Sequence, residues 1–238
     1  MLSYDNPVSV NEKHSSTATM AATINSMGSN PKPINATVMP VTSNNTIAKV
    51  NGQPGPKHHH IWLVTGPAGC GKTTVAQHLS NSLNLPYIEG DEFHPKANID
   101  KMANGIPLTD ADRWDWLTAL REESLRQLAS GAEGVVLTCS ALKRKYRDVI
   151  RVAPYYSHDV VLHFIYLHAP ENVLLERVGM RQGHYMGANM VHSQFSILEP
   201  PTAEEMDVIS LDVSGPMDGI MREALDQVLK KIDEVASS

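Results

Sequence analysis

From residue 61 onward, short apolar runs alternate with longer segments in which apolar residues recur every three or four positions. The apolar runs predict strands at 61–66, 86–89, 134–139, 161–167 and 207–213. The amphipathic segments predict helices that begin near Lys72, Thr109, Ala141, Pro170, Asn189 and Met217. Strands that alternate with helices indicate βαβ units, so the pattern predicts a three-layer α/β/α fold around a parallel sheet of about five strands.

The pattern is different in residues 1–59, which are rich in Ser, Thr, Asn and Pro and show no sustained periodicity. Few large apolar groups are present to offset the entropy lost on ordering, so we expect a disordered extension there and one folded domain at 60–238. The first arginine is Arg113, which argues against an Arg-rich mitochondrial presequence. Because neither a secretory signal nor an apolar run of membrane-spanning length is found, we expect a cytoplasmic protein that does not bind membranes.

Charge and cysteine content narrow the function classes. The 238 residues carry a formal net charge of -6, and this balance gives no support for nucleic-acid binding, which needs many Lys and Arg contacts to phosphate. The two cysteines, Cys70 and Cys139, are too few and too far apart for a disulfide framework or a zinc motif. An anionic substrate would therefore depend on a local basic pocket.

The sequence "GPAGCGKT" follows the first predicted strand and precedes a predicted helix, which is the context that a phosphate-binding loop requires. Its backbone N–H groups would surround the phosphates of ATP, Lys72 would bridge the outer phosphates, and the Thr73 hydroxyl would bind Mg²⁺. The helix N-terminus can lower the pKa of the Cys70 thiol and make it redox-sensitive, although a tolerated loop residue is the simpler interpretation. The predicted ATP-binding residues of the loop are Gly66, Pro67, Ala68, Gly69, Cys70, Gly71, Lys72, Thr73 and Thr74.

Arg177 and Arg181 lie four residues apart and therefore share one face of a predicted helix. Two guanidinium groups so placed can neutralise phosphate charge and stack on a base, which suits a transferring phosphoryl group. The alternative is a solvated helix surface paired with Glu176. We favour ATP binding for Arg177 and a catalytic role for Arg181, because a lid-like segment follows at Gly183.

The stretch "EGDEFHPKANIDKM" concentrates charge at the end of the second predicted strand. Glu89 and Asp91 could orient a Mg²⁺-bound water or accept a proton from an attacking hydroxyl. His94, Lys101 and Arg113 add donors that suit an anionic molecule rich in hydroxyl groups. The alternative is a surface loop with scattered charges.

At this point the chain resembles the gluconokinase family. The resemblance is carried by "GPAGCGKT", "EGDEFHPKANIDKMANGIPLTDADRWDWL", "CSALKRKYRD" and "RQGHYMGANMVHSQFSILEPP", in order and across essentially all of residues 61–215. It implies the fold of the shikimate and adenylate kinase group, with a lid. It also implies ATP-dependent phosphorylation of D-gluconate at the 6-hydroxyl, which gives ADP and the 6-phosphogluconate of the pentose phosphate pathway, with Mg²⁺ as cofactor.

The resemblance also assigns residues. It makes Asp91 the base that contacts the 6-hydroxyl, alongside catalytic Lys72 and Arg181. Ser140 would cap the helix that follows it. The chain departs from the family at Glu89, where many members have Asp; Glu89 would reach the metal through water. The residues implied to bind the substrate are Asp91, His94, Lys101, Arg113, Lys143, Arg147, His184 and Gln194.

Other functions remain open at the level of sequence. A phosphate-loop switch that hydrolyses nucleotide is the alternative from another class, and a shikimate-type or nucleoside-type kinase is the alternative among enzymes. The family offers a homodimer as a precedent, and no residue pattern here identifies an interface. Residues 1–60 lie outside the resemblance.

Overall fold

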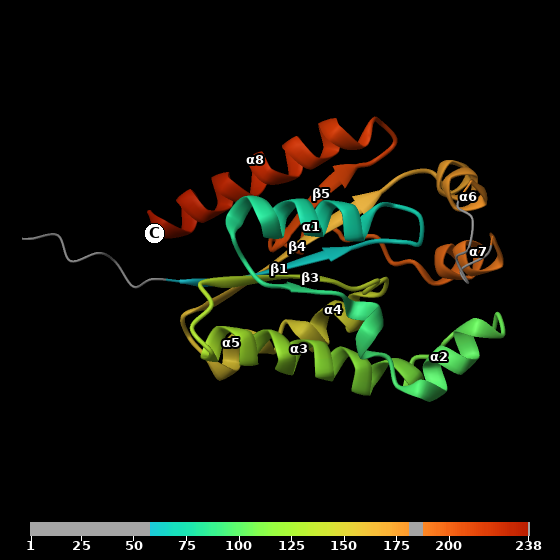
Figure 1. Ribbon diagram of the computed structural model, residues 1–238, viewed down its shortest axis with the longest axis horizontal. Helices are drawn as coiled ribbons and strands as arrows, with labels where there is room; N and C mark the ends of the chain where they lie inside the picture. Colours follow the sequence, from blue (N-terminus) through green and yellow to red (C-terminus); the bar gives the residue numbers. More distant parts are fainter. Residues whose placement is uncertain (1–57, 181–187, 238) are drawn as a thin grey trace, which may run out of the picture. The chain divides into compact units, whose positions relative to one another are not determined.

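The computed structural model of the protein describes residues 58–180 and 188–237. A five-stranded parallel sheet forms its centre (Figure 1), in the spatial order β2-β3-β1-β4-β5. The sheet confirms the predicted class of fold, because every predicted strand is present and all neighbours are parallel. The strands are β1 (His59–Thr65), β2 (Tyr87–Ile88), β3 (Gly134–Thr138), β4 (Val160–His168) and β5 (Val208–Asp212).

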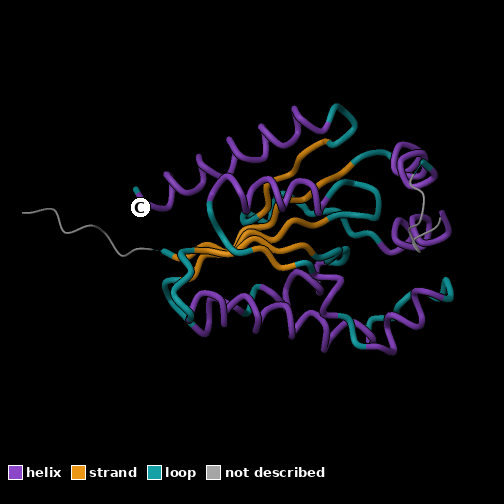
Figure 2. The backbone as a smooth tube through the Cα atoms, in the orientation of Figure 1, coloured by secondary structure: helices purple, strands orange, loops and turns teal. Residues whose placement is uncertain are grey.

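Helices cover both faces of the sheet, as Figure 2 shows. Helices α1 and α8 lie on one face, α3, α4 and α5 lie on the other, and α2, α6 and α7 lie near the C-terminal ends of the strands (Figure 1). The helices are α1 (Lys72–Leu83), α2 (Lys96–Ala103), α3 (Trp114–Ala129), α4 (Arg144–Ile150), α5 (Ala153–Tyr156), α6 (Glu171–Gly179), α7 (Ala188–Ile197) and α8 (Met217–Ala236), with short 3₁₀ turns η1 (Gly90–Phe93) and η2 (Ala111–Arg113).

The central strand β1 contributes side chains to two hydrophobic cores, one on each face of the sheet. Its residues Ile61, Trp62, Leu63 and Val64 are all completely buried, because β1 is paired on both edges and covered on both faces. Successive side chains of a strand point to opposite faces. Trp62 and Val64 accordingly join the core beside α1 and α8, whereas Ile61 and Leu63 join the core beside α3 and α4.

Two helices begin later than the pattern predicts. Helix α3 begins at Trp114 instead of near Thr109, and α4 begins at Arg144 instead of Ala141. The residue Ala141 has a φ of 25°, which is incompatible with a right-handed helix start. Short helices α2 and α5 were not predicted, because neither is long enough to show a clear period.

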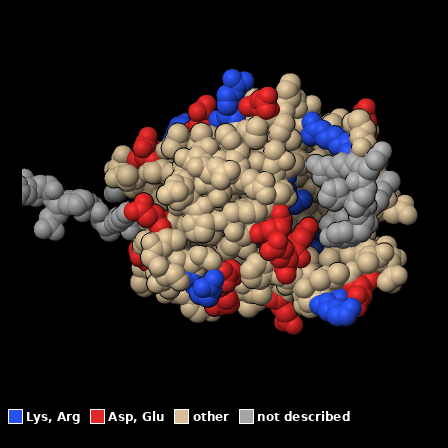
Figure 3. Space-filling view, in the orientation of Figure 1, with Lys and Arg blue, Asp and Glu red and all other residues tan. Residues whose placement is uncertain are grey.

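The expected extension at 1–59 lies outside the described residues except for its last two positions, and β1 begins at His59. Within the described ranges, no helix has the length and apolar character needed to cross a bilayer. On the face shown in Figure 3, the described Lys and Arg side chains are scattered among Asp and Glu. No broad patch of one charge sign is seen on this face among the described residues.

Candidate active site

The phosphate loop, residues 66–73, connects β1 to α1 at the C-terminal edge of the sheet. Its first glycine, Gly66, has a φ of 139°, and a Cβ placed there would lie 2.3 Å from the carbonyl oxygen of Leu167. The glycines Gly69 and Gly71 also have positive φ, so this backbone path strongly favours glycine at three positions. The path leads into the first turn of α1, whose N–H groups have no partner within the helix and can bind an anion.

Lys72 lies across this loop. Its Nζ donates hydrogen bonds to the carbonyl oxygens of Gly66 and Pro67, at 3.1 and 3.2 Å. The thiol of Cys70 is completely buried beneath the loop. Burial raises the pKa of Cys70, and the nearby Lys72 ammonium only partly opposes the rise, which favours the interpretation of Cys70 as an unreactive loop residue.

A narrow cavity of about 30 Å³ lies between the phosphate loop and the segment that follows β2. Met102, Leu108 and Met190 form a small buried cluster beside it, so the α2 region and α7 meet there. The position, beyond the C-terminal ends of parallel strands, is where ligands bind in open α/β sheets. The walls are formed by Ala68, Lys72, Asp91, His94, Met102, Leu108, Arg113, Ser140, Met190 and Gln194.

His94 is a buried, neutral hydrogen-bonding group in this cavity. Its ring stacks on Trp116 with the ring centroids 4.0 Å apart. Burial, assisted by the charge of Arg113, lowers the pKa of His94 to about 4. Its Nδ1 accepts a long hydrogen bond of 3.5 Å from the Asn98 amide, so the single ring proton is on Nε2, which lies 4.0 Å from Asp91 Oδ1.

Asp91 lines the same cavity as Lys72 and His94. About half of its side chain, 52%, is exposed. Partial burial raises the pKa of Asp91, the Lys72 ammonium opposes that rise, and the Glu89 carboxylate adds to it. A carboxylate with a raised pKa is a stronger base than an ordinary one, which suits proton transfer from a hydroxyl.

Arg113 is a buried cation that has no acidic partner within residues 58–180 and 188–237. The residue is 7% exposed, and its guanidinium lies 5.4 Å from the centre of the Tyr146 ring. Its Nη2 donates a weak hydrogen bond of 3.4 Å to the carbonyl of Leu108, while Nε has no partner among the described residues. A buried guanidinium without a carboxylate is costly, so this cavity is suited to an anionic ligand.

Glu89 faces the phosphate loop from the end of β2. Its Oε2 accepts a hydrogen bond of 3.0 Å from the Thr73 hydroxyl. Burial alone would raise the pKa of Glu89, but hydrogen bonds from Thr138, Tyr87 and Thr73 outweigh it and lower the pKa. Hydroxyl and carboxylate oxygens are the ligands that Mg²⁺ prefers, so this pair fits the predicted metal site.

Helices α6 and α7 both contact the phosphate loop. Helix α6 packs so closely that a Cβ on Gly69 would lie 2.9 Å from the side chain of Val178. From α6, Arg177 Nη2 donates a hydrogen bond of 3.3 Å to the carbonyl of Gly215, just before α8. From α7, Gln194 Oε1 accepts the N–H of Ala68 at 2.7 Å.

Comparison with known proteins identifies the family. The family model described as "AAA domain" matches residues 61–196. A probable gluconokinase of Schizosaccharomyces pombe is 46% identical over 190 residues, which cover 79% of this chain and 97% of that protein. The chain belongs to the gluconokinase family. It is similar over 73% of its length to the thermoresistant gluconokinase of Escherichia coli, with 36% identity and 95% of that protein covered.

Solved structures agree with this assignment. The crystal structure of a gluconokinase from Sinorhizobium meliloti 1021 matches with 40% identity and a TM-score of 0.64, over 76% of this chain and 96% of that one. As a gluconokinase family member with a phosphate-loop kinase fold, the chain is a phosphotransferase. Nothing in these comparisons assigns roles to individual residues, so the geometry of the site must do so.

Both lysines that the gluconokinase resemblance assigns to the substrate are paired with acids. Lys101 Nζ lies 2.6 Å from Asp112 Oδ1, and Lys143 Nζ lies 3.0 Å from Asp110 Oδ1. Neither lysine lines the described cavity. The hydrogen bond from Lys101, followed by those from Thr109, lowers the pKa of Asp112 to about 2, so this acid stays ionised and paired.

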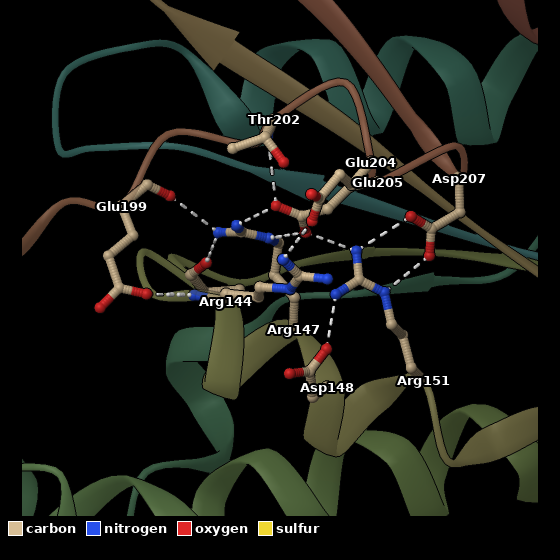
Figure 4. Close-up of polar contacts among 10 residues, drawn as sticks. Arg144, Arg147, Asp148, Arg151, Glu199, Thr202, Glu204, Glu205 and Asp207 are labelled. Carbon is tan, nitrogen blue, oxygen red and sulfur yellow. Dashed lines mark hydrogen bonds and ion pairs between the residues drawn. The ribbon is translucent and has the colours of Figure 1, made fainter.

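The structure corrects the role expected for Arg147. This residue is 1% exposed, and its Nε and Nη2 donate to both carboxylate oxygens of Glu205, at 2.7 and 2.6 Å. Its Nη1 donates to the carbonyl oxygens of Ala141 and Glu199. Figure 4 shows these contacts and the neighbouring Arg151, which also binds Glu205. The guanidinium of Arg147 therefore joins α4 to the segment before β5, and Arg147 is not among the residues that line the cavity.

The same network replaces the expected helix cap. The N–H of Arg144, the first residue of α4, donates to Glu199 Oε2 at 2.8 Å (Figure 4). Ser140 does not cap this helix; its carbonyl accepts a hydrogen bond from Thr65. A cap supplied 55 residues away in the chain cannot be read from local sequence.

Of the remaining predicted residues, Arg181 and His184 lie outside the described residues. Sequence reasoning missed several groups that line or support the cavity. Asn98 and Met102 lie within the charged stretch; Asn98 is four residues after His94 and Met102 is four residues after Asn98, and this helical spacing was the available signal. The others are Leu108, Trp116 and Met190.

Proposed function

We propose that the protein transfers the γ-phosphoryl group of ATP to the 6-hydroxyl of D-gluconate, with Asp91 as the base. The reaction class follows from membership of the gluconokinase family, whose members phosphorylate gluconate with ATP. The observation that carries the assignment of residues is the shared cavity, whose walls include Lys72 of the phosphate loop, Asp91 and Arg113. In this proposal one cavity holds Lys72 for the phosphoryl donor, Asp91 as the base and Arg113 for the acceptor.

The charges divide the cavity into two ends. At one end, Lys72 and the N-terminus of α1 would bind the β- and γ-phosphates. At the other, Arg113 would bind the gluconate carboxylate, because it is buried without an acidic partner among the described residues. His94 Nε2–H would donate to a hydroxyl of the sugar acid. These contacts would hold the far end of the acceptor chain near Asp91.

Asp91 would orient the 6-hydroxyl and take its proton as the oxygen attacks phosphorus. Phosphoryl transfer leaves the protein little covalent chemistry, so positioning and charge neutralisation supply most of the rate enhancement. The Lys72 ammonium would offset the charge on the phosphoryl oxygens. Because the free space is about 30 Å³, entry of gluconate requires α2 and α7 to separate at their Met102 and Met190 contact.

Mg²⁺ would be held on the nucleotide side. The Thr73 hydroxyl would bind it directly and Glu89 would act through Thr73 or a bound water. When bound, the ion would neutralise charge on the β- and γ-phosphate oxygens. Among the described residues, no cluster of three or more His, Cys, Asp or Glu side chains could hold a metal ion.

The test is an assay of ADP release over a panel of acceptors: gluconate, other aldonates, shikimate and nucleosides. We expect rapid, Mg²⁺-dependent release with gluconate, and formation of a product phosphorylated at carbon 6. Slow ATP turnover that is indifferent to every acceptor would instead support a nucleotide-hydrolysing switch. Preference for shikimate or a nucleoside would move the protein to another kinase specificity. A homodimer stays a prediction, which sedimentation of the full chain can test.

A further inference from the structure

Glu89 is held by three hydroxyl groups. Its Oε2 accepts from Thr73 at 3.0 Å and from Tyr87 at 2.5 Å, and its Oε1 accepts from Thr138 at 2.5 Å. Thr73 belongs to the phosphate loop, whereas Tyr87 and Thr138 belong to the neighbouring strands β2 and β3. Both oxygens of the carboxylate are therefore fixed, and two of the three donors come from the sheet.

The protons in this cluster have defined directions. Thr138 is 2% exposed, and its Oγ1 accepts the N–H of Gly90 at 3.0 Å. Its own proton is thereby directed to Glu89. An ionised carboxylate only accepts hydrogen bonds, so the Thr73 hydroxyl must also donate to Glu89. The lone pairs of Thr73 Oγ1 then face away from Glu89 and are available to a cation.

The backbone makes this arrangement rigid. A Cβ on Gly90 would lie 1.9 Å from the carbonyl oxygen of Thr138, so the end of β2 packs directly against the end of β3. From the other side, Trp116 Nε1 donates to the carbonyl of Gly90 at 2.7 Å. The position of Thr138 relative to Glu89 is thus set by packed main chain and a buried indole.

We propose that Tyr87 and Thr138 are positioning residues for the Mg²⁺ that accompanies the nucleotide. By fixing both oxygens of Glu89, they orient the Thr73 hydroxyl so that its oxygen faces the metal. This inference rests on the proposed function. The two strand hydroxyls also remove the rotational freedom of the long Glu89 side chain, which has one more rotatable bond than aspartate.

The experiment measures metal binding without gluconate. Mn²⁺ replaces Mg²⁺ as the probe, and the free Mn²⁺ signal in electron paramagnetic resonance is titrated in the presence of ADP. Tyr87→Phe and Thr138→Val should each weaken Mn²⁺ binding about 10-fold, the scale expected when a partner of a metal ligand is removed. Thr138→Ser keeps the hydroxyl and should bind Mn²⁺ nearly as wild type does. The matched control Tyr155→Phe removes a hydroxyl from a residue that is 83% exposed.

Two further measurements separate positioning from general damage. ADP affinity in the presence of a chelator should be unchanged in Tyr87→Phe and Thr138→Val. In a Glu89→Gln background, removing either hydroxyl should have little additional effect on Mn²⁺ affinity, because the group that they position is already lost.

Wild-type Mn²⁺ affinity in both hydroxyl variants would overturn the proposal, as would an equal loss of metal-free ADP binding. Neither result depends on the acceptor. If wild-type protein binds Mn²⁺ and ADP but does not phosphorylate gluconate, the proposed function fails while the role of Tyr87 and Thr138 is still decided by these titrations.

Discussion

Gln194 and Ala68 join the helix α7 to the phosphate loop. The Gln194 side-chain oxygen accepts the backbone N–H of Ala68 at 2.7 Å, and Gln194 is 7% exposed. Sequence resemblance assigned Gln194 to the substrate as a donor. The structure shows its oxygen bound to Ala68 within the phosphate loop, so the residue couples α7 to that loop.

Replacing Gln194 by Met should loosen this part of the phosphate loop. A buried N–H that loses its acceptor costs about 1–3 kcal/mol, so hydrogen exchange of the Ala68 amide in the nucleotide-free protein should accelerate about 10-fold. Gln194→Glu retains an acceptor oxygen and serves as the matched control. Equal protection of Ala68 in wild type and Gln194→Met would contradict the coupling.

Arg113→Met should separate ligand binding from stability. Loss of a charge-assisted hydrogen bond of about 1.5–3 kcal/mol should raise the KM for gluconate about 10- to 100-fold. The melting temperature should stay constant or rise, since the variant removes a buried guanidinium that has no acidic partner among the described residues. Arg121→Met, which removes an arginine paired with Glu122, is the control and should leave KM unchanged. A large loss of stability with a normal KM would assign Arg113 a structural role.

The opposite result is expected at Arg147. Arg147→Met breaks a buried bidentate pair with Glu205 and should lower the free energy of unfolding by about 3 kcal/mol in urea titrations. The KM for gluconate should change little. Adding Glu205→Leu should recover part of the loss, because it removes the buried Glu205 carboxylate that Arg147→Met leaves beside an apolar side chain. Wild-type stability with a raised KM would restore the substrate role.

Acid should destabilise the protein through the buried imidazole of His163. Burial, with smaller contributions from His60 and Lys231, lowers the pKa of His163 from 6.5 to about 4. In this pH range the His163 imidazole binds a proton in the unfolded chain but not in the folded chain. The free energy of unfolding therefore falls as the pH decreases from about 6.5 to 4. His163→Phe should reduce the loss of unfolding free energy across this pH range by about 1–3 kcal/mol. An unchanged slope in urea titrations at several pH values would contradict this account.

Much of the fold followed from local patterns. The run at 61–64 is uniformly apolar because β1 is covered on both faces, and the phosphate-loop motif needs only residues adjacent in sequence. Asp91 and His94 were also identifiable within the charged stretch that follows β2, and Arg113 was identifiable as a basic residue further along the chain. The three side chains line one cavity, and their chemical roles stay predictions.

Other features depend on partners far away in the chain. Arg147 looked like a ligand residue because sequence shows a basic side chain after a strand, but not the Glu205 that neutralises it. Lys143 is likewise paired with Asp110, 33 residues earlier. Tyr87 and Thr138 carried no signal, since a hydroxyl in a strand acquires meaning only when the neighbouring strand places a carboxylate beside it.

Asp91 is the residue on which the proposed phosphoryl transfer depends most directly. The decisive measurement is kcat for phosphorylation of gluconate by Asp91→Asn, with ATP affinity measured on the same protein and Asp115→Asn, an exposed aspartate of α3, as the matched control. Asparagine cannot accept the proton of the hydroxyl, so kcat should fall about 10²- to 10⁴-fold while ATP still binds. Turnover near the wild-type rate in Asp91→Asn would contradict the assignment of Asp91 as the base.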